Sequence, residues 1–258
     1  MYCRPVVNAF WVGARLGPVH ASCVQSFVRQ GHRMILHCYE APEDVPKGVE
    51  IADAALLLPR ERVVRHRKTG SLALASDLFR LELQAAGSGI YVDADCYCVQ
   101  PLKDEEFTFG WETSHYIASG VLRLPAESAL LAAMRAIATT PGFIPLWETR
   151  RRKLRYRLRR SIGMPVPIEN MRWGSVGPQA LTHYAIEYGV GHHAKPHDVL
   201  YPVHPEHVGL FLDPEVTIAD IGTSRTRVIH LWNEILRTME VSPPPESPLA
   251  EIIAALET

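Results

Sequence analysis

The 258-residue sequence predicts an α/β protein built around a largely parallel sheet. Two observations carry this prediction. Strand-like and helical segments alternate within the first ~40 residues, and a later helix is followed after a glycine turn by a short apolar strand. The composition agrees, because 47% hydrophobic and 21% charged residues allow a sizeable core. A chain with long disordered stretches is therefore excluded.

The expected elements follow one another regularly. Residues 5–12 are apolar and β-branched and predict a strand, residues 18–30 have helical spacing, and residues 33–39 predict a second strand. Residues 42–59 are rich in turn residues and are expected to be irregular. Further helices are expected at 71–86, 126–138, 178–188 and 249–256, and further strands at 90–92, 107–111, 117–124 and 228–232.

Charge is distributed unevenly along the chain. The net charge is −1, but eight of the 27 lysines and arginines lie between residues 150 and 160. The rest of the chain has 19 basic and 28 acidic residues and therefore carries a net charge of about −9. We expect one domain over residues 1–240 with a basic helical insertion at 148–162. A proline-rich linker and a short helix are expected to follow over 241–258.

Location is predicted from what the sequence lacks. No apolar run reaches the ~18 residues of a membrane helix, and residues 1–13 do not have the pattern of a signal peptide. Five cysteines are too few, and odd in number, for a disulfide framework. We expect a cytoplasmic protein, with peripheral contact to the inner membrane face through the basic insertion as an option.

The strand at 90–92 runs directly into Asp93-Ala94-Asp95, which predicts two carboxylates at a sheet edge. Carboxylates this close repel each other, and a divalent cation relieves the repulsion. Such a cation usually binds phosphate oxygens as well, so the segment suits a diphosphate ligand. The alternative is an ordinary acidic turn after a strand.

The helix at 71–86 contributes two more polar side chains. The helix rises ~14 Å from Asp77 to its end, and the strand extends ~13 Å from Gly89 to Asp93, so the two lengths are nearly equal. A reversal at 87–89 would bring Asp77 and Arg80 level with Asp93, on one helix face. These side chains could accept sugar hydroxyls and neutralise phosphate charge. The alternative is a simple helix ion pair.

The segment from Ser76 to Leu102 resembles the core of glycosyltransferases with a DXD sugar-binding motif. This group includes family 32 sugar transferases, bacterial capsular-polysaccharide transferases and α-1,4-galactosyltransferases. Ser88 departs from the usual Gly-Gly pair. Segments 10–13 (FWVG), 173–178 (WGSVGP) and 228–233 (VIHLWN) are also similar to the family, so the resemblance spans roughly 10–235. The matching residues in the central segment are Ser76, Asp77, Arg80, Leu83, Gly89, Ile90, Tyr91, Asp93, Asp95, Pro101 and Leu102.

The resemblance implies a GT-A-like fold, which is a Rossmann-type mixed sheet flanked by helices with helical insertions. It implies a nucleoside-diphosphate sugar as donor, with UDP-sugars first, and a bound Mn²⁺ or Mg²⁺. Asp95 would ligate the metal, Asp93 would contact the metal or the donor, and His230 would be a third ligand. Hexose transfer to a glycan or lipid-linked acceptor is implied, with retention, but no residue is assigned as a nucleophile.

The resemblance also implies a donor-binding set. Asp77 and Arg80 would hold the donor sugar, Trp11 would border the nucleobase, and Trp232 would lie near the β-phosphate. For Trp11, a place in the core is an equally good interpretation.

The basic insertion is a second candidate site. Leu154, Leu158 and Ile162 are spaced i, i+4 and i+8, so a helix would carry an apolar stripe bordered by cations. Such a helix could lie on an anionic membrane and would suit a lipid-linked acceptor. A solvated or internally paired helix is the alternative, and nucleic-acid binding is disfavoured because no second basic patch is present. The candidate residues are Arg151, Arg152, Lys153, Arg155 and Arg159.

Two other functions remain open. Haloacid-dehalogenase-like phosphatases also place D-x-D after a strand and would use Asp93 as nucleophile. Their pattern needs a threonine or valine soon after, whereas Cys96 follows here, and the C-terminal half lacks their acidic loop. The other alternative is a non-catalytic carbohydrate- or membrane-binding module.

Overall fold

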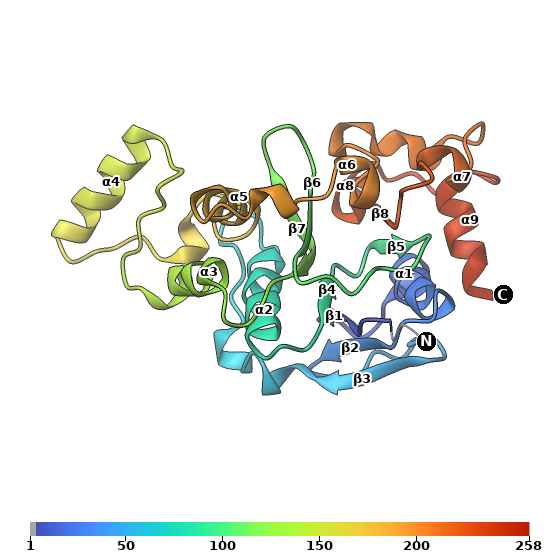
Figure 1. Cartoon of the computed structure of the whole chain (residues 1–258), viewed down its shortest axis with the longest axis horizontal. Helices are drawn as coiled ribbons and strands as arrows, with labels where there is room; N and C mark the ends of the chain where they lie inside the picture. Colours follow the sequence, from blue (N-terminus) through green and yellow to red (C-terminus); the bar gives the residue numbers. More distant parts are fainter. Residues whose placement is uncertain (1–3, 258) are drawn as a thin grey trace.

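The computed structural model describes residues 4–257 and has a six-stranded mixed sheet flanked by helices (Figure 1). The strand order is β3-β2-β1-β4-β7-β6, and β5 pairs with β8 in a separate two-stranded sheet. The first four of these strands run parallel, whereas β7 and β6 are antiparallel to their neighbours. The predicted α/β class with a mixed sheet is confirmed. The strands are β1 (Val7–Trp11), β2 (Met34–Cys38), β3 (Val49–Asp53), β4 (Ile90–Val92), β5 (Cys96–Cys98), β6 (Thr108–Trp111), β7 (Ile117–Arg123) and β8 (Val228–His230).

Helices cover both faces of the large sheet. Figure 1 shows α1 and α2 on opposite sides of β1 and β4. Short 3₁₀ helices occupy parts of the loops. The α-helices are α1 (Gly17–Arg29), α2 (Ala73–Ala85), α3 (Ala129–Thr139), α4 (Arg150–Ser161), α5 (Pro178–Glu187), α6 (His197–Leu200), α7 (Ile218–Ile221), α8 (Asn233–Thr238) and α9 (Pro248–Ala254).

The alternation of side chains along the central strands creates two cores. Val7 and Ala9 of β1 face α1, whereas Phe10 faces α2, where its ring stacks on Phe79 at 4.5 Å between centroids. The same period of two separates Ile90 from Tyr91 in β4. Burial of both strand faces explains why these segments read as continuous apolar runs.

Three expected elements differ from the structure. Residues 42–59 include the edge strand β3, which is mostly exposed and is held by its pairing with β2. The strand expected at 228–232 ends at His230, because Trp232 adopts a left-handed backbone conformation with φ of 54°. The terminal helix is not separated from the domain: Leu249 and Ile252 of α9 are buried against α1, and Ser22 Oγ donates a hydrogen bond to the carbonyl of Ile252.

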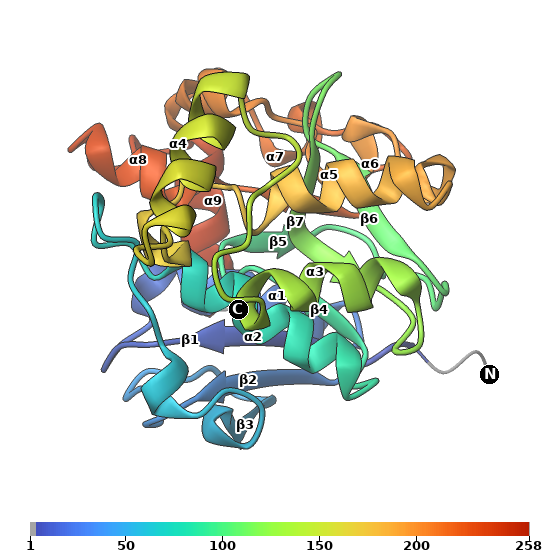
Figure 2. The ribbon, with the colours of Figure 1, turned by 90° about the vertical axis from the view of Figure 1, so that its left-hand side faces the viewer.

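The basic segment is helical, as predicted, and forms α4. Figure 1 places α4 at one end of the molecule, apart from β4, β5 and β8, and Figure 2 shows this end facing the viewer. Among residues 4–257, no helix combines the length and apolar composition that crossing a bilayer requires.

Candidate metal centre

The loop between β4 and β5 holds Asp93 and Asp95 and is fixed from both sides. The backbone N–H of Asp93 donates to the carbonyl of Gly120 on β7 at 2.7 Å, and the N–H of Cys96 donates to the carbonyl of Asp93 at 3.0 Å. The N–H of Leu231 donates to the carbonyl of Asp95 at 3.0 Å. Both aspartates therefore sit where the large and the small sheet meet.

His230 reaches these carboxylates through the pairing of β8 with β5, in which it lies opposite Cys96. Its Nε2 is 3.3 Å from Oδ1 of Asp95 and 3.8 Å from Oδ2 of Asp93. Its Nδ1 is buried and has no hydrogen-bond partner among the described residues. Gly120 permits this approach, because a Cβ there would lie 2.9 Å from Oδ2 of Asp93 and 3.3 Å from the imidazole.

The electrostatics of this cluster follow from burial and opposite charge. Burial alone would lower the pKa of His230, but the carboxylates of Asp95 and Asp93 outweigh it and raise that pKa to about 10. Burial would raise the pKa of Asp95, but His230 and the backbone N–H of Asn233 hold it well below its usual range. The N–H of Asn233, the first residue of α8, donates to Oδ2 of Asp95 at 3.0 Å. The raised pKa keeps His230 protonated between the two carboxylates, so a cation that binds these donor atoms would displace that proton.

Arg80 and Asp77 lie behind Asp93, as the helix and strand lengths predict. The guanidinium of Arg80 is 2.8 Å from Oδ1 of Asp93 and 3.3 Å from Asp77, and it also donates to the hydroxyl of Ser119. The hydroxyl of Tyr91 donates to the same Oδ1 of Asp93 at 2.9 Å. Burial raises the pKa of Asp77 to about 6, with Arg80 opposing this and Asp93 adding to it. Oδ1 of Asp93 is therefore engaged, and Oδ2 is the oxygen that faces His230.

The two predicted tryptophans border the cluster. The ring of Trp232 packs edge-on against His230 at 4.0 Å between centroids, and its Nε1 donates to the carbonyl of Val203 at 2.9 Å. Trp11 ends β1, with its ring 4.6 Å from that of His20, and its Nε1 is buried without a partner among the described residues. His20 in turn lies 3.1 Å from the amide of Asn233. Each indole thus reaches Asp95 through intermediate residues: Trp232 through His230, and Trp11 through His20 and Asn233.

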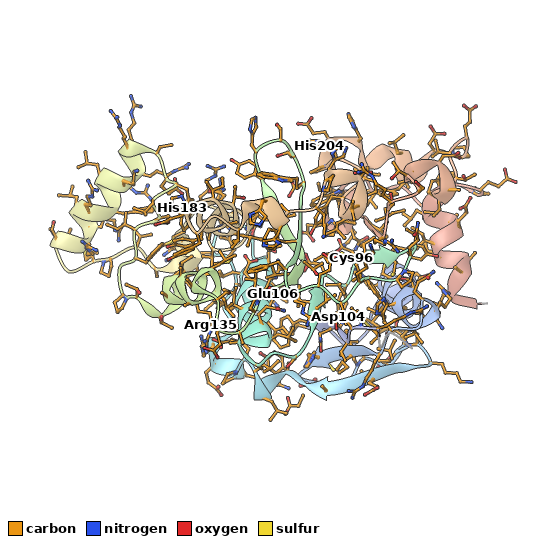
Figure 3. All side chains as sticks on the ribbon, in the orientation of Figure 1. Cys96, Asp104, Glu106, Arg135, His183 and His204 are labelled. Atoms are coloured by element: carbon orange, nitrogen blue, oxygen red, sulfur yellow. The ribbon has the colours of Figure 1, made fainter. Side chains whose placement is uncertain are left out.

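The available donor atoms fit a hard divalent cation. Two carboxylates and one imidazole nitrogen converge, and carboxylate oxygens suit Mg²⁺ and Mn²⁺. Cys96 is close as well, since donor atoms of Asp95, Cys96 and His230 lie within 4.8 Å of one another. Burial, with Asp95 and Asp93 adding to it, raises the pKa of the Cys96 thiol well above its usual value. The thiol thus stays protonated, and Cys96 lies in the interior, where its side chain packs as a small apolar group (Figure 3).

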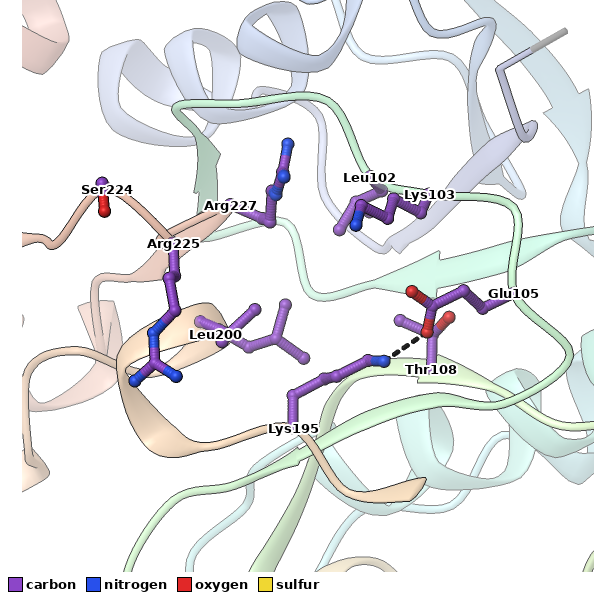
Figure 4. A pocket seen from close by; sticks show the side chains of 10 residues that line it. Leu102, Lys103, Glu105, Thr108, Lys195, Leu200, Ser224, Arg225 and Arg227 are labelled. Atoms are coloured by element: carbon purple, nitrogen blue, oxygen red, sulfur yellow. Dashed lines mark ion pairs between the residues drawn. The ribbon is translucent and has the colours of Figure 1, made fainter. Parts of the chain in front are cut away.

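The structure does not bring the basic candidates to this cluster. They lie on α4, and the ion pair of that helix joins Arg152 to Glu148 at 3.1 Å. A separate cavity of about 260 Å³ lies at the other end of the β5–β8 sheet, where the ion pair of Lys195 with Glu105 borders it (Figure 4). The acidic cluster does not line that cavity.

Sequence reasoning missed several residues that shape the cluster. Ser119 and Gly120 form a small pair inside an otherwise apolar strand, which is a signal of close approach by another segment. Gly177 lies over Asp77, since a Cβ at that glycine would be 2.4 Å from Oδ1 of Asp77. Glu112 follows β6; burial raises the pKa of its carboxyl, and His230 lowers it by a smaller amount.

No protein-family model matches this chain, and no curated protein matches its sequence.

Proposed function

We propose that this protein is a metal-dependent glycosyltransferase. It would transfer a hexose from a nucleoside-diphosphate sugar to a glycan or lipid-linked acceptor, with UDP-sugars as the first donors to test. One observation carries the proposal: the carboxylates of Asp93 and Asp95 converge on Nε2 of His230, which arrives from a distant part of the chain. The resemblance around Ser76–Leu102 supports the same activity.

Asp93, Asp95 and His230 are the residues that would hold Mn²⁺ or Mg²⁺. A divalent cation supplies Lewis-acid stabilisation of the negative charge that develops on a departing nucleoside diphosphate. Asp95 is oriented by the N–H of Asn233, and Asp93 is oriented by Arg80 and Tyr91. These bonds fix the carboxylates before a donor binds, which is what electrostatic preorganisation requires.

Arg80 and Asp77 would bind the donor beside this centre. Their side chains are 6% and 12% exposed, and they lie 3.3 Å apart. In a nearly dry site, the carboxylate of Asp77 can accept a hydrogen bond from a sugar hydroxyl, and Arg80 holds Asp93 in place through their ion pair. Gly177 lies directly over Asp77, and a side chain at that position would crowd the carboxylate.

The decisive experiment is donor hydrolysis. Purified protein is incubated with a panel of nucleotide sugars and Mn²⁺, and released nucleoside diphosphate is measured by chromatography. We expect release from one donor, abolished by EDTA and lowered at least about tenfold by Asp95→Asn or His230→Gln. Asp104→Asn is the matched control, because Asp104 is an exposed carboxylate paired with Arg123.

The competing functions give different results in the same assay. Hydrolysis of simple phosphate esters that is lost in Asp93→Asn would indicate a phosphatase and contradict the proposal. Binding of sugars without any donor hydrolysis would indicate a non-catalytic module. Thermal-shift measurements with nucleoside diphosphates and Mn²⁺ identify the base, since a ligand at 100 times its Kd stabilises the native state by about 2.7 kcal/mol.

A further inference from the structure

Helix α4 has a composition unlike the rest of the protein. Its sequence, RRRKLRYRLRRS, contains no acidic residue. The helix begins after Thr149, whose hydroxyl accepts a hydrogen bond from the N–H of Arg152 at 3.4 Å. It projects from one end of the molecule in Figure 1, and in Figure 2 this end faces the viewer. The surface at this end of the molecule is therefore strongly positively charged.

The aliphatic side chains of α4, and that of Ile162 directly after it, point away from the protein. Leu154, Leu158 and Ile162 are 66%, 63% and 63% exposed. At about 100° per residue they fall within an arc of about 80°. Tyr156 lies on the opposite side and is buried against Val166 and Met171. The helix is therefore attached through Tyr156, and its apolar stripe is left facing solvent.

A cationic cavity of about 380 Å³ lies at the base of this helix. It is lined by Arg67, Arg155, Arg159, Val166, Pro167 and Asn170, with no carboxylate among them. The Nε of Arg159 donates to the carbonyl of Met164 at 3.2 Å, which orients this guanidinium. Three arginines line this one cavity, and guanidinium groups are suited to bind the oxygens of a phosphate group. Because Arg155 and Arg159 border the apolar stripe, the cavity and the stripe can engage one surface together.

We propose that α4 docks this protein on a membrane that contains anionic phospholipids. Leu154, Leu158 and Ile162 would enter the boundary between headgroups and acyl chains. The surrounding cations would contact the headgroups, and the cavity of Arg67, Arg155 and Arg159 would take one lipid phosphate. Nucleic acid does not account for this arrangement, because an exposed aliphatic stripe has no role in binding phosphates or stacking bases. The inference is independent of the proposed function, since it involves neither donor nor metal.

Vesicle co-sedimentation in EDTA tests the proposal directly. We expect binding to phosphatidylcholine vesicles only when phosphatidylglycerol is included, and weaker binding as salt is raised. Each basic residue near an anionic surface contributes roughly a fivefold change in affinity. Arg155→Gln/Arg159→Gln should therefore weaken binding roughly 25-fold. Leu154→Ser/Leu158→Ser should weaken it at least about tenfold, through lost apolar burial. Lys47→Gln/Lys103→Gln removes the same charge from exposed positions away from α4 and should change binding less than about twofold.

Insertion has its own readout. The emission of Leu158→Trp should shift to the blue with anionic vesicles relative to the wild-type protein, and thermal melting shows whether each variant is folded. Failure of the wild-type protein to bind anionic vesicles, or equal binding to neutral ones, would overturn the proposal. A serine variant that binds like the wild type, with an oligonucleotide displacing the vesicles, would indicate nucleic-acid binding instead. Donor hydrolysis does not enter any of these outcomes.

Discussion

The acidic cluster and helix α4 differ in how their charged side chains are placed: those of the cluster are largely buried and paired, whereas those of α4 are mostly exposed. Asp93 and Asp95 are 26% and 17% exposed, and hydrogen bonds or ion pairs from four separate segments fix them. On α4 the cations are mostly exposed, and Tyr156 is the buried side chain of the helix. Buried charges require partners and so define a geometry, whereas solvated charges add little to stability and stay available for another surface. Single substitutions in the cluster should therefore change the stability of the protein strongly, whereas single substitutions on α4 should not.

The largest contrast is expected from removing one arginine in each region. Arg80→Met leaves the carboxylates of Asp77 and Asp93 without their buried partner, and we expect the free energy of unfolding to fall by about 3–5 kcal/mol. Arg157→Met on α4 should change it by less than about 0.5 kcal/mol. Urea denaturation of both variants measures the difference. Equal losses would show that the cluster does not depend on its buried ion pairs.

Acid should next reveal a buried titratable group outside both regions, His37 on β2. Burial lowers the pKa of His37 to about 4, and its Nε2 is bonded to Asn8 at 3.0 Å. As the pH falls, the imidazole of His37 is protonated in the unfolded state before it is protonated in the folded state. The stabilisation that neutral His37 contributes is therefore complete above pH ~6.5 and is lost as the pH falls toward 4. The loss in the free energy of unfolding is at most about 3 kcal/mol. Asp77 has the opposite effect, because its raised pKa favours the folded state at lower pH. The difference between the wild type and His37→Gln therefore isolates His37.

The measurement is urea denaturation of both proteins from pH 7 to pH 4. His37→Gln keeps a donor for Asn8 but cannot titrate, so its stability should fall less steeply with acid than that of the wild type. Parallel curves would contradict the assignment.

Sequence patterns predicted the parts of the fold that are governed by local chemistry. The buried strands and amphipathic helices follow hydrophobic period, and the lengths of α2 and β4 bring Arg80 to Asp93. The edge strand β3 escaped prediction because pairing with β2, rather than its own residues, makes it a strand. The approach of His230 to Asp95 depends on the pairing of β5 with β8, and the room for it depends on Gly120 of β7. These are long-range contacts, and only the family resemblance connected His230 with the aspartates.

Glycine substitutions give a smaller test of the same comparison. A Cβ at Gly177 would lie 2.4 Å from Oδ1 of Asp77, a carboxylate held by Arg80. We expect Gly177→Ala to destabilise the protein by about 1–3 kcal/mol, because the fixed carboxylate must move. Gly209→Ala is the control, since nothing lies within 4 Å of a Cβ at that exposed position. Thermal denaturation compares them, and equal melting temperatures would mean that Asp77 is free to shift.

The smallest effect is expected on α4. Leu154→Gln/Leu158→Gln should change the free energy of unfolding by less than about 0.5 kcal/mol, because both side chains are already exposed in the folded protein. A buried leucine behaves differently: Leu83→Ala in α2 should lose about 2–5 kcal/mol. If the glutamine variant were strongly destabilised, the stripe would pack against the protein and could not be free for a membrane. If the variant keeps its stability but no longer binds vesicles, these leucines serve membrane binding and not folding.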